Sequence, residues 1–200
     1  MAAVAQLRYR KSLEYVIGGM KLYYSASYLS PVGKYTLASN GNSLVGVWLE
    51  GQKYHSSNMP DTLTEREDMP VFCTVRTWLD RYFAGEKPEI SEISLAPVGG
   101  EFRQLVWGIL CDIPYGKVIT YGEIAKKIAV KTGKKRMSSQ AVGGAVGHNP
   151  ISIIIPCHRV IGSNGSLTGY AGGILTKVKL LELEGADISR LFVPKKSSAL

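Results

Sequence analysis

Long hydrophobic runs and cysteines are both scarce in this 200-residue sequence. The longest conspicuous apolar run, residues 151–156, is far shorter than the roughly 18 residues of a membrane span, so we expect no membrane partner. Residues 1–19 carry four charged side chains and no continuous apolar stretch, which argues against a secretory signal. The three scattered cysteines, Cys73, Cys111 and Cys157, exclude a disulfide framework and a CxxC zinc site. These absences indicate a reducing, cytoplasmic setting.

Acidic residues are few in the second half of the chain. Lys and Arg number 24 against 16 Asp and Glu, and the whole net charge of +8 lies in residues 100–200. Residues 117–136 alone carry seven basic side chains and a single acidic one, Glu123. This density favours a polyanion as partner. A solvated helix face beside a basic loop is the alternative, and the charge run by itself favours that alternative.

The first half of the chain predicts a small sheet with one covering helix. Short β-prone runs are separated by turn signals; the runs are 22–24, 35–38 and 43–48, and the turns are 31–33 and 40–42. Apolar residues at helical spacing over 71–84 predict one helix, which Gly85 and Pro88 stop. We therefore expect an N-terminal α/β domain over 20–95, preceded by a disordered leader or extension at 1–19.

The second half predicts a mostly helical domain over 97–188, followed by a tail at 189–200. Amphipathic spacing predicts helices at 102–110 and 175–184. Thr120 and Glu123 form a capping box that starts a helix through Ala129, and Ser138 or Ser139 can cap a short helix at 140–146. Two short helices joined by a basic loop indicate a helix-turn-helix, and the glycine-rich stretch 162–173 indicates a turn-rich wing.

The short helix at 140–146 has almost no side-chain bulk. Its sequence Ala141-Val142-Gly143-Gly144-Ala145 includes two glycines, each of which costs roughly 1 kcal/mol in a helix interior. A helix that gives up this stability indicates a place where its backbone must approach a neighbouring surface closely. Tight packing against another helix and entry into a narrow nucleic-acid groove, with the basic loop on phosphates, explain this equally well.

The sequence around Cys157 points to chemistry. A β-branched run leads to Pro156, after which Cys157, His158 and Arg159 follow at once. A buried structural role is the commonest fate of a cysteine in apolar surroundings. His158 can accept or orient the thiol proton, and Arg159 adds positive charge, which are the conditions for a thiolate nucleophile. Cys73 and Cys111 have no such neighbours and are predicted to be core residues.

The run Pro156-Cys157-His158-Arg159-Val160, with Asn149-Pro150 upstream, resembles the active-site signature of the O6-alkylguanine-DNA alkyltransferases. The resemblance covers nearly all of 100–187 and, more weakly, 20–95. It implies an α+β fold, with a small β-sheet-plus-helix N-terminal domain and a mostly helical, winged-helix-like C-terminal domain. It also implies a monomer without cofactor or metal that binds double-stranded DNA from the minor groove. Such a protein flips out the damaged guanine and moves its O6-alkyl group irreversibly onto its own cysteine, once per molecule.

The same resemblance implies roles for individual residues. Cys157 would be the nucleophile, His158 the base acting through a water, and Glu184 the residue that holds His158. Asn149 would brace the turn that carries the site, and Tyr121 would hydrogen-bond a ring nitrogen of the leaving guanine. The set implied to bind the base is Val160, Tyr170, Ala171 and Gly172. The set implied to bind DNA is Gln140, Ala141, Gly143, Gly144, Arg136, Lys134 and Lys135.

Two departures from the family pattern matter. Many members carry an arginine where this chain has Gln140, and that arginine fills the gap left by the flipped base. The Gln140 side chain can still fill that gap and hydrogen-bond to the orphaned cytosine, but it carries no charge. The zinc ligands found near the N-terminus of some relatives have no counterpart, because Cys73 and His55 cannot make a four-ligand site.

Other interpretations remain open at this point. A non-catalytic sensor of alkylated bases typically has tryptophan in place of the cysteine, so Cys157 argues against it. A papain-like thiol hydrolase would have no use for the thin, basic helix region. A winged-helix transcription factor would keep Cys157 as a core residue. Separately from these interpretations, Glu184 has the alternative of a solvated residue near a helix end, and Tyr121 that of a packing residue only.

Overall fold

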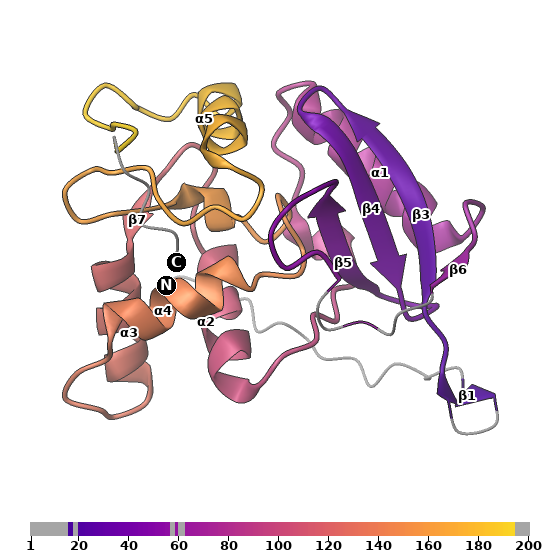
Figure 1. Cartoon of the computed structure of the whole chain (residues 1–200), viewed down its shortest axis with the longest axis horizontal. Coiled ribbons are helices and arrows are strands. Elements are labelled where there is room, and N and C mark those ends of the chain that lie inside the picture. Colours follow the sequence, from indigo (N-terminus) through magenta and orange to yellow (C-terminus); the bar gives the residue numbers. More distant parts are fainter. Residues whose placement is uncertain (1–15, 18–19, 57–58, 60–62, 195–200) are drawn as a thin grey trace. The chain divides into compact units, whose positions relative to one another are not determined.

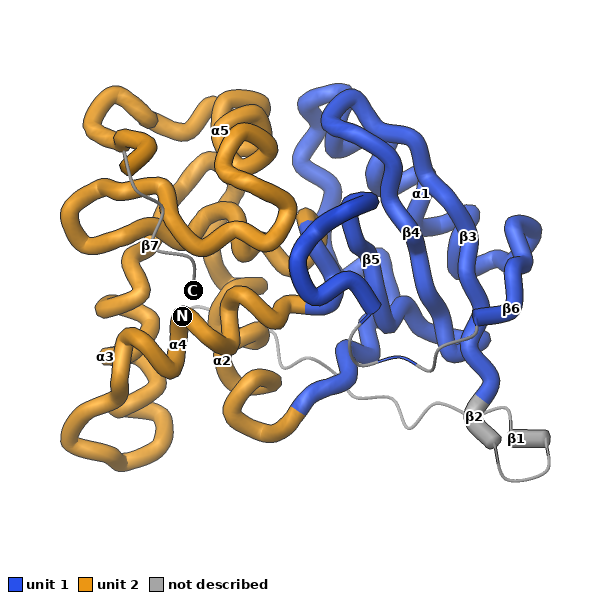
Figure 2. The backbone as a smooth tube through the Cα atoms, in the orientation of Figure 1, with its two compact units in different colours: residues 1–99, 150–152 blue, residues 100–149, 153–200 orange. Residues whose placement is uncertain are grey.

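The computed structural model describes residues 16–17, 20–56, 59 and 63–194. The chain forms two compact units, shown in Figure 2: unit 1 contains residues 1–99 and 150–152, and unit 2 contains residues 100–149 and 153–200. Within the described ranges, no helix is both long enough and apolar enough to cross a membrane. Most of the predicted leader lies outside the described residues. Its described pair, Val16–Ile17, forms a strand that was not expected there.

The elements follow one another along the chain as Figure 1 labels them. The helices are α1 (Pro70–Phe83), α2 (Glu101–Cys111), α3 (Tyr121–Lys131), α4 (Ser139–Gly147) and α5 (Ile174–Leu183), with 3-10 turns η1 (Ile90–Glu92) and η2 (Cys157–Arg159). The strands are β1 (Val16–Ile17), β2 (Met20–Lys21), β3 (Tyr24–Ser30), β4 (Gly33–Ser39), β5 (Leu44–Leu49), β6 (Thr64–Glu65), β7 (Ile119–Thr120) and β8 (Val160–Ile161). All five predicted helices are confirmed within one or two residues.

The sheet of unit 1 has the strand order β5-β4-β3-β6. β3 and β4 pair antiparallel, and the register runs from Tyr24↔Ser39 to Ser30↔Gly33. The predicted strand at 22–24 is wrong, because the strand begins at Tyr24 and continues to Ser30. Ser25, Ser27 and Ser30 weaken the β propensity of this stretch, and its pairing with β4 outweighs that weakness.

Helix α1 lies against β3 and β4 of this sheet (Figure 1). Its buried face carries Phe72, Val75, Trp78, Leu79 and Tyr82, as the apolar spacing predicts. Cys73 is exposed, so its prediction as a core residue is wrong. The residue follows Phe72 by one position, about 100° around the helix and therefore off the buried face.

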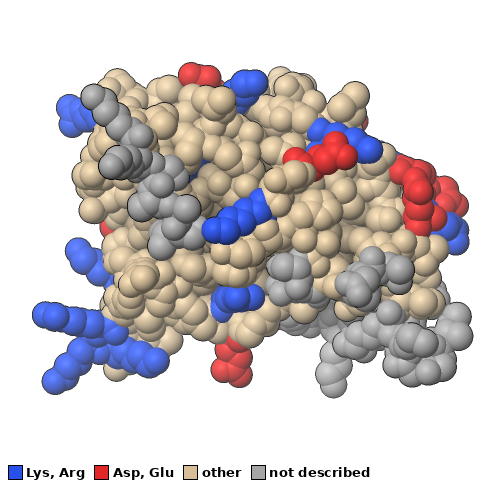
Figure 3. Space-filling model, viewed as in Figure 1, with Lys and Arg blue, Asp and Glu red and all other residues tan. Residues whose placement is uncertain are grey.

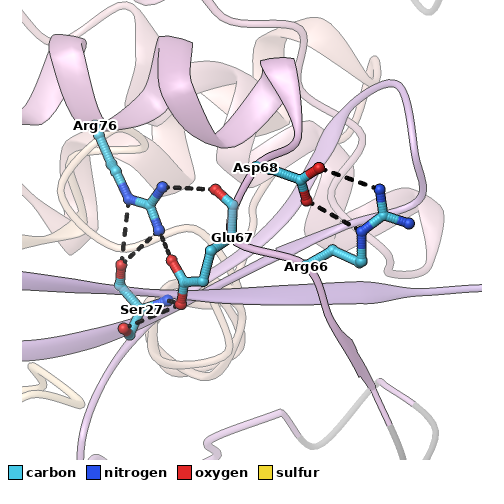
Figure 4. Close-up of polar contacts among 5 residues, drawn as sticks. All are labelled: Ser27, Arg66, Glu67, Asp68 and Arg76. Carbon is cyan, nitrogen blue, oxygen red and sulfur yellow. Dashed lines mark hydrogen bonds and ion pairs between the residues drawn. The ribbon is translucent and has the colours of Figure 1, made fainter.

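A polar cluster joins α1 to β3, the strand that pairs with the short edge strand β6 (Figure 4). The Arg76 guanidinium donates to the carbonyl oxygens of Ser27 and Glu67 and also contacts the Glu67 carboxylate. The Glu67 carboxylate accepts from the Ser27 backbone N–H at 2.9 Å. Beside it, Arg66 pairs with Asp68. These groups satisfy one another's hydrogen bonds and charges at the exposed edge of the unit, and they fix the loop between β6 and α1.

Unit 2 consists of helices and two short parallel strands. α3 packs on α4, and α2 contacts both. The side chain of Trp107 on α2 donates from Nε1 to the carbonyl of Ala145 on α4 at 2.9 Å. β7 pairs with β8, so the start of α3 lies beside the chain that leaves η2. The predicted wing at 162–173 has turns at 163–164 and 171–172 and an isolated bridge between Ser166 and Phe192, and is otherwise irregular.

Candidate active site

Between α4 and Cys157, three residues of the chain belong to unit 1 before the chain returns to unit 2. Residues Pro150–Ser152 belong to unit 1, where the N–H of Val47 on β5 donates to Pro150 and the N–H of Ser152 donates to Val47. The next residue, Ile153, has φ 70° although it is β-branched and buried. A side chain of this kind in the left-handed region costs roughly 1–3 kcal/mol and persists only where its surroundings enforce it. The strain lies four residues before Cys157.

Cys157 begins the 3-10 turn η2 and is 5% exposed. The side-chain amide of Asn149 donates to the carbonyl of Ile155 at 2.8 Å and to Cys157 Sγ at 3.0 Å. Asn149 thus braces the turn and also contacts the sulfur. Burial raises the pKa of the Cys157 thiol, while the Asn149 hydrogen bond and the charge of Lys177 act in the opposite direction.

His158 is fully buried and contacts Glu184, the residue that caps the C-terminus of α5. Its Nε2 lies 2.6 Å from Glu184 Oε1, whereas its Nδ1 has no hydrogen-bond partner among the described residues. Burial lowers the pKa of His158, against the opposing effect of Glu184. A neutral ring that donates from Nε2 to the carboxylate leaves Nδ1 as an acceptor.

The Glu184 carboxylate is held by more than His158. Arg159 donates to both of its oxygens at 2.8 and 2.9 Å, and the backbone N–H of Gly116 donates to Oε2 at 3.1 Å. Arg159 also donates to the carbonyl of Ile113 at 2.6 Å. Burial alone would raise the pKa of Glu184, but the hydrogen bonds and charges of His158 and Arg159 hold that pKa well below its usual range. The alternative of a solvated Glu184 is therefore wrong.

Tyr121 lies at the first turn of α3, directly after the Thr120 capping box. Its hydroxyl donates to the carbonyl of Thr168 at 3.1 Å, and burial raises its pKa to about 12. Gly169 has φ +71°, and a Cβ there would lie 2.3 Å from the Tyr121 hydroxyl oxygen. Only glycine allows this approach of the loop to the tyrosine.

The remaining residues implied to bind the base lie around this loop. Val160 follows η2 and begins β8. Tyr170 is buried, and its ring lies edge-on to the His158 ring with centroids 6.5 Å apart. Ala171 and Gly172 form the turn between Tyr170 and the start of α5, and both are partly exposed. These four residues and the Cys157 turn all belong to unit 2.

The structure also brings in a residue that the sequence analysis missed, Lys177. Its side chain is fully buried, and Nζ donates to the carbonyl of Val160 and, at 2.8 Å, to that of Thr168. A signal was available, because Lys177 stands at helical spacing from Ile174, Leu180 and Leu181 on the apolar face of α5.

The surface implied to bind DNA consists of α4 and the loop before it. Lys134, Lys135 and Arg136 are exposed, and Figure 3 shows basic side chains projecting at the lower left, over the loop that joins α3 to α4 in Figure 1. Ser138 caps α4 by accepting from the N–H of Ala141 at 3.3 Å.

The exposed face of α4 carries Gln140, Ala141 and Gly144. Gly143 is buried within unit 2, and this burial speaks against its place in the DNA-binding set. At Gly144 an added Cβ would meet no atom within 4 Å. Internal packing therefore does not require glycine at this exposed position.

Comparison with known proteins agrees with this description over both units. The family model for the 6-O-methylguanine DNA methyltransferase DNA binding domain matches residues 101–186, and that for the 6-O-methylguanine DNA methyltransferase ribonuclease-like domain matches residues 22–97. A methylated-DNA–protein-cysteine methyltransferase of Haemophilus influenzae is 44% identical over 164 residues, covering 82% of this chain and 86% of the relative. Its counterpart in Methanosarcina acetivorans is 45% identical and is covered over 99% of its length.

Solved structures give the same result. The crystal structure of Mycobacterium tuberculosis O6-methylguanine methyltransferase superposes with a TM-score of 0.71 at 42% identity, covering 88% of this chain and 97% of that one. The structure of the Mycobacterium tuberculosis protein in complex with DNA superposes with a TM-score of 0.69 at 41% identity, covering 84% and 94%.

Proposed function

We infer the chemistry of this site from one premise: the chain belongs to the 6-O-methylguanine DNA methyltransferase family. Its activity is DNA repair by direct transfer of an alkyl group from guanine to a cysteine of the protein itself, in a single turnover. The roles of individual residues, the alkylated base and the mode of DNA binding are the proposal developed below.

Cys157 is the proposed acceptor of the alkyl group. Of the three cysteines, it has both an amide donor on its sulfur and a histidine directly after it. In the reaction a bond forms between Cys157 Sγ and the alkyl carbon as the bond from that carbon to guanine O6 breaks. The electron pair leaves with the oxygen and the guanine takes up a proton, so a thiol and an O6-alkylguanine give a thioether and guanine. The observation that carries this proposal is the 3.0 Å contact of Asn149 Nδ2 with Cys157 Sγ.

His158 is the proposed base that takes the thiol proton. Its Nδ1 is buried and has no partner among the described residues, so a water can bridge it to the thiol. The ionised Glu184 fixes the ring by accepting from Nε2. Burial lowers the pKa of His158, and the positive charge of Arg159 on the same carboxylate acts in the same direction, so His158 stays neutral before the reaction. A neutral imidazole is the form that can accept a proton.

The guanine pocket is proposed to lie between the Cys157 turn and the loop at 168–172. The carbonyl of Val160 can accept from the exocyclic amine of the base, and the turn at Ala171 and Gly172 offers backbone N–H groups. Tyr121 can hydrogen-bond a ring nitrogen of the leaving guanine only if its hydroxyl gives up the bond to Thr168. Burial keeps this hydroxyl protonated, since its pKa is raised to about 12.

The protein is proposed to bind duplex DNA through α4 and the basic loop, with α4 in the minor groove. The low bulk at Ala141 and Gly144 suits a narrow groove, and exposed Lys134, Lys135 and Arg136 suit phosphates on its rim. Gln140 stands at the position from which a side chain can fill the gap left by an extruded guanine. We expect the protein to act as a monomer in the cytoplasm, where it has access to chromosomal DNA.

Intact-mass measurement tests the proposed acceptor. Wild-type protein incubated with a duplex containing O6-methylguanine should gain the mass of one methyl group, and Cys157→Ser protein should gain none. Cys73→Ser and Cys111→Ser proteins serve as matched controls and should gain the same mass as wild type. A methyl gain on the Cys157→Ser protein would refute the assignment.

A further inference from the structure

Lys177 is a buried cation that the proposed chemistry does not use. Its side chain is fully buried on α5, and no carboxylate pairs with it among the residues that the structure describes. Burying an unpaired ammonium is costly, so its retention needs a compensating role. Its hydrogen bonds go to two backbone carbonyls, those of Val160 and Thr168.

These two carbonyls belong to segments proposed to contact the guanine. The Thr168 carbonyl also accepts from the hydroxyl of Tyr121 at 3.1 Å. A continuous network therefore runs from Tyr121 through Thr168 and Lys177 to Val160. Because each carbonyl oxygen has two lone pairs, the Val160 oxygen can still accept a hydrogen bond from a ligand. Lys177 fixes the direction in which that carbonyl points.

The charge of Lys177 also acts on the Cys157 thiol. Lys177 donates to the carbonyl of Val160, the residue that caps the turn η2, and Cys157 is the first residue of that turn. The charge of Lys177 lowers the pKa of Cys157 against the effect of burial. Burial lowers the pKa of Lys177 itself to about 8, and the interaction with Cys157 works against that decrease. The ammonium form therefore still predominates at pH 7.

The other titratable groups near Cys157 come from neighbouring elements and do not supply this charge. Tyr121 on α3 stays neutral at this pH because its pKa is raised to about 12. Burial lowers the pKa of His158, and the charge of Lys177 acts on it in the same direction. The positive charge of Arg159 is paired with Glu184.

We propose that Lys177 is a positioning residue of the alkyl-transfer site: its ammonium holds the Val160 and Thr168 carbonyls in place and stabilises the Cys157 thiolate. This proposal rests on the proposed function, in which Cys157 is the acceptor. Loss of the charge should reduce the fraction of thiolate near neutral pH, and loss of the hydrogen bonds should loosen the pocket wall.

Three substitutions separate these two contributions. Lys177→Met removes the charge and the donors at similar volume, Lys177→Gln keeps a donor without charge, and Lys177→Arg keeps both. All are made in a Cys73→Ser background, which removes the exposed cysteine. Iodoacetamide labelling of Cys157, read by peptide mass across pH 6–10, reports the thiolate without DNA. Methyl transfer from a duplex containing O6-methylguanine is measured over the same pH range.

We expect Lys177→Met and Lys177→Gln to slow both reactions at pH 7 by roughly tenfold, as for a buried anion that loses its counter-charge. Their pH profiles should move to higher pH, and Lys177→Arg should stay within about threefold of the parent protein. The proposal is overturned if Lys177→Gln restores the parental pH profile, since that result would assign a purely structural role. It is equally overturned if none of the three variants folds by circular dichroism. Absence of methyl transfer to the parent protein, with the labelling profiles shifted as expected, would instead refute the proposed function.

Discussion

Gly144→Ala should stabilise the protein while weakening its binding to DNA. Gly144 lies inside α4 on its exposed face, and a Cβ added there meets no atom within 4 Å. Alanine is more favourable than glycine by about 1 kcal/mol in a helix interior, so the free energy of unfolding should rise by about that amount. For a chain of 200 residues that unfolds as one cooperative unit, such a gain raises the melting temperature by about 2–4 °C, which differential scanning calorimetry resolves.

The same methyl group should interfere with DNA if α4 enters the groove. Overpacking of a close contact typically costs about 1–3 kcal/mol, which raises the dissociation constant by roughly 5- to 150-fold. Fluorescence anisotropy with an unmodified duplex measures this constant at fixed salt. Gly147→Ala is the control, because a Cβ there also meets nothing within 4 Å but lies at the C-terminal end of α4. Wild-type affinity in the Gly144→Ala protein would refute the groove contact, and a lower melting temperature would refute the stability argument.

Three further predictions follow from the charges and the exposed surface. Stability should fall with acid, because folding lowers the pKa of both His158 and Glu184. The fall should begin below about pH 6.5, where His158 in the unfolded state takes up a proton, and steepen below about pH 4.5, where Glu184 does so. A melting temperature that stays constant from pH 7 to 4 would contradict this. If both lysines contact phosphates, replacing Lys134 and Lys135 with alanine should flatten the log–log salt dependence of DNA binding by about 1.8, at about 0.9 per contact; an unchanged slope returns this loop to the solvated-face interpretation. Gln140→Ala should slow single-turnover transfer from duplex DNA far more than transfer from free O6-alkylguanine, because a free base has no stack to leave; equal slowing would assign Gln140 to the pocket or the fold.

The parts of the fold that the sequence predicts best depend on neighbours in the chain. The capping box of α3 is an example: Thr120 accepts from the N–H of Glu123 at 3.1 Å, and Glu123 accepts from the N–H of Thr120 at 2.8 Å. The two residues that carry that signal lie three positions apart, so no tertiary information is needed. The pairing of Pro150–Ser152 with β5 joins residues about 100 positions apart, and no local pattern announces it. The left-handed backbone of Ile153 is likewise enforced by its surroundings against the preference of its own side chain.

The site residues also divide into those that the local sequence predicts and those whose role depends on the tertiary structure. The motif around Cys157 and the resemblance it carries point to His158 and Glu184, and the structure brings these two side chains within 2.6 Å. The contribution of Lys177 depends on carbonyls presented by two other segments, so its sequence shows only a lysine on an apolar helix face. Gly143 and Gly144 are indistinguishable in sequence, whereas their burial separates them.

The most direct test of the central claim counts the methyl groups that each molecule accepts and locates them. Limiting protein is mixed with excess duplex that carries isotopically labelled O6-methylguanine, and label bound to protein is followed over time and then mapped by peptide. A thiol acceptor without a resolving partner predicts a plateau at one methyl group per protein, all of it on the peptide that contains Cys157. Continued turnover beyond one equivalent, or label on any other peptide, would contradict the account.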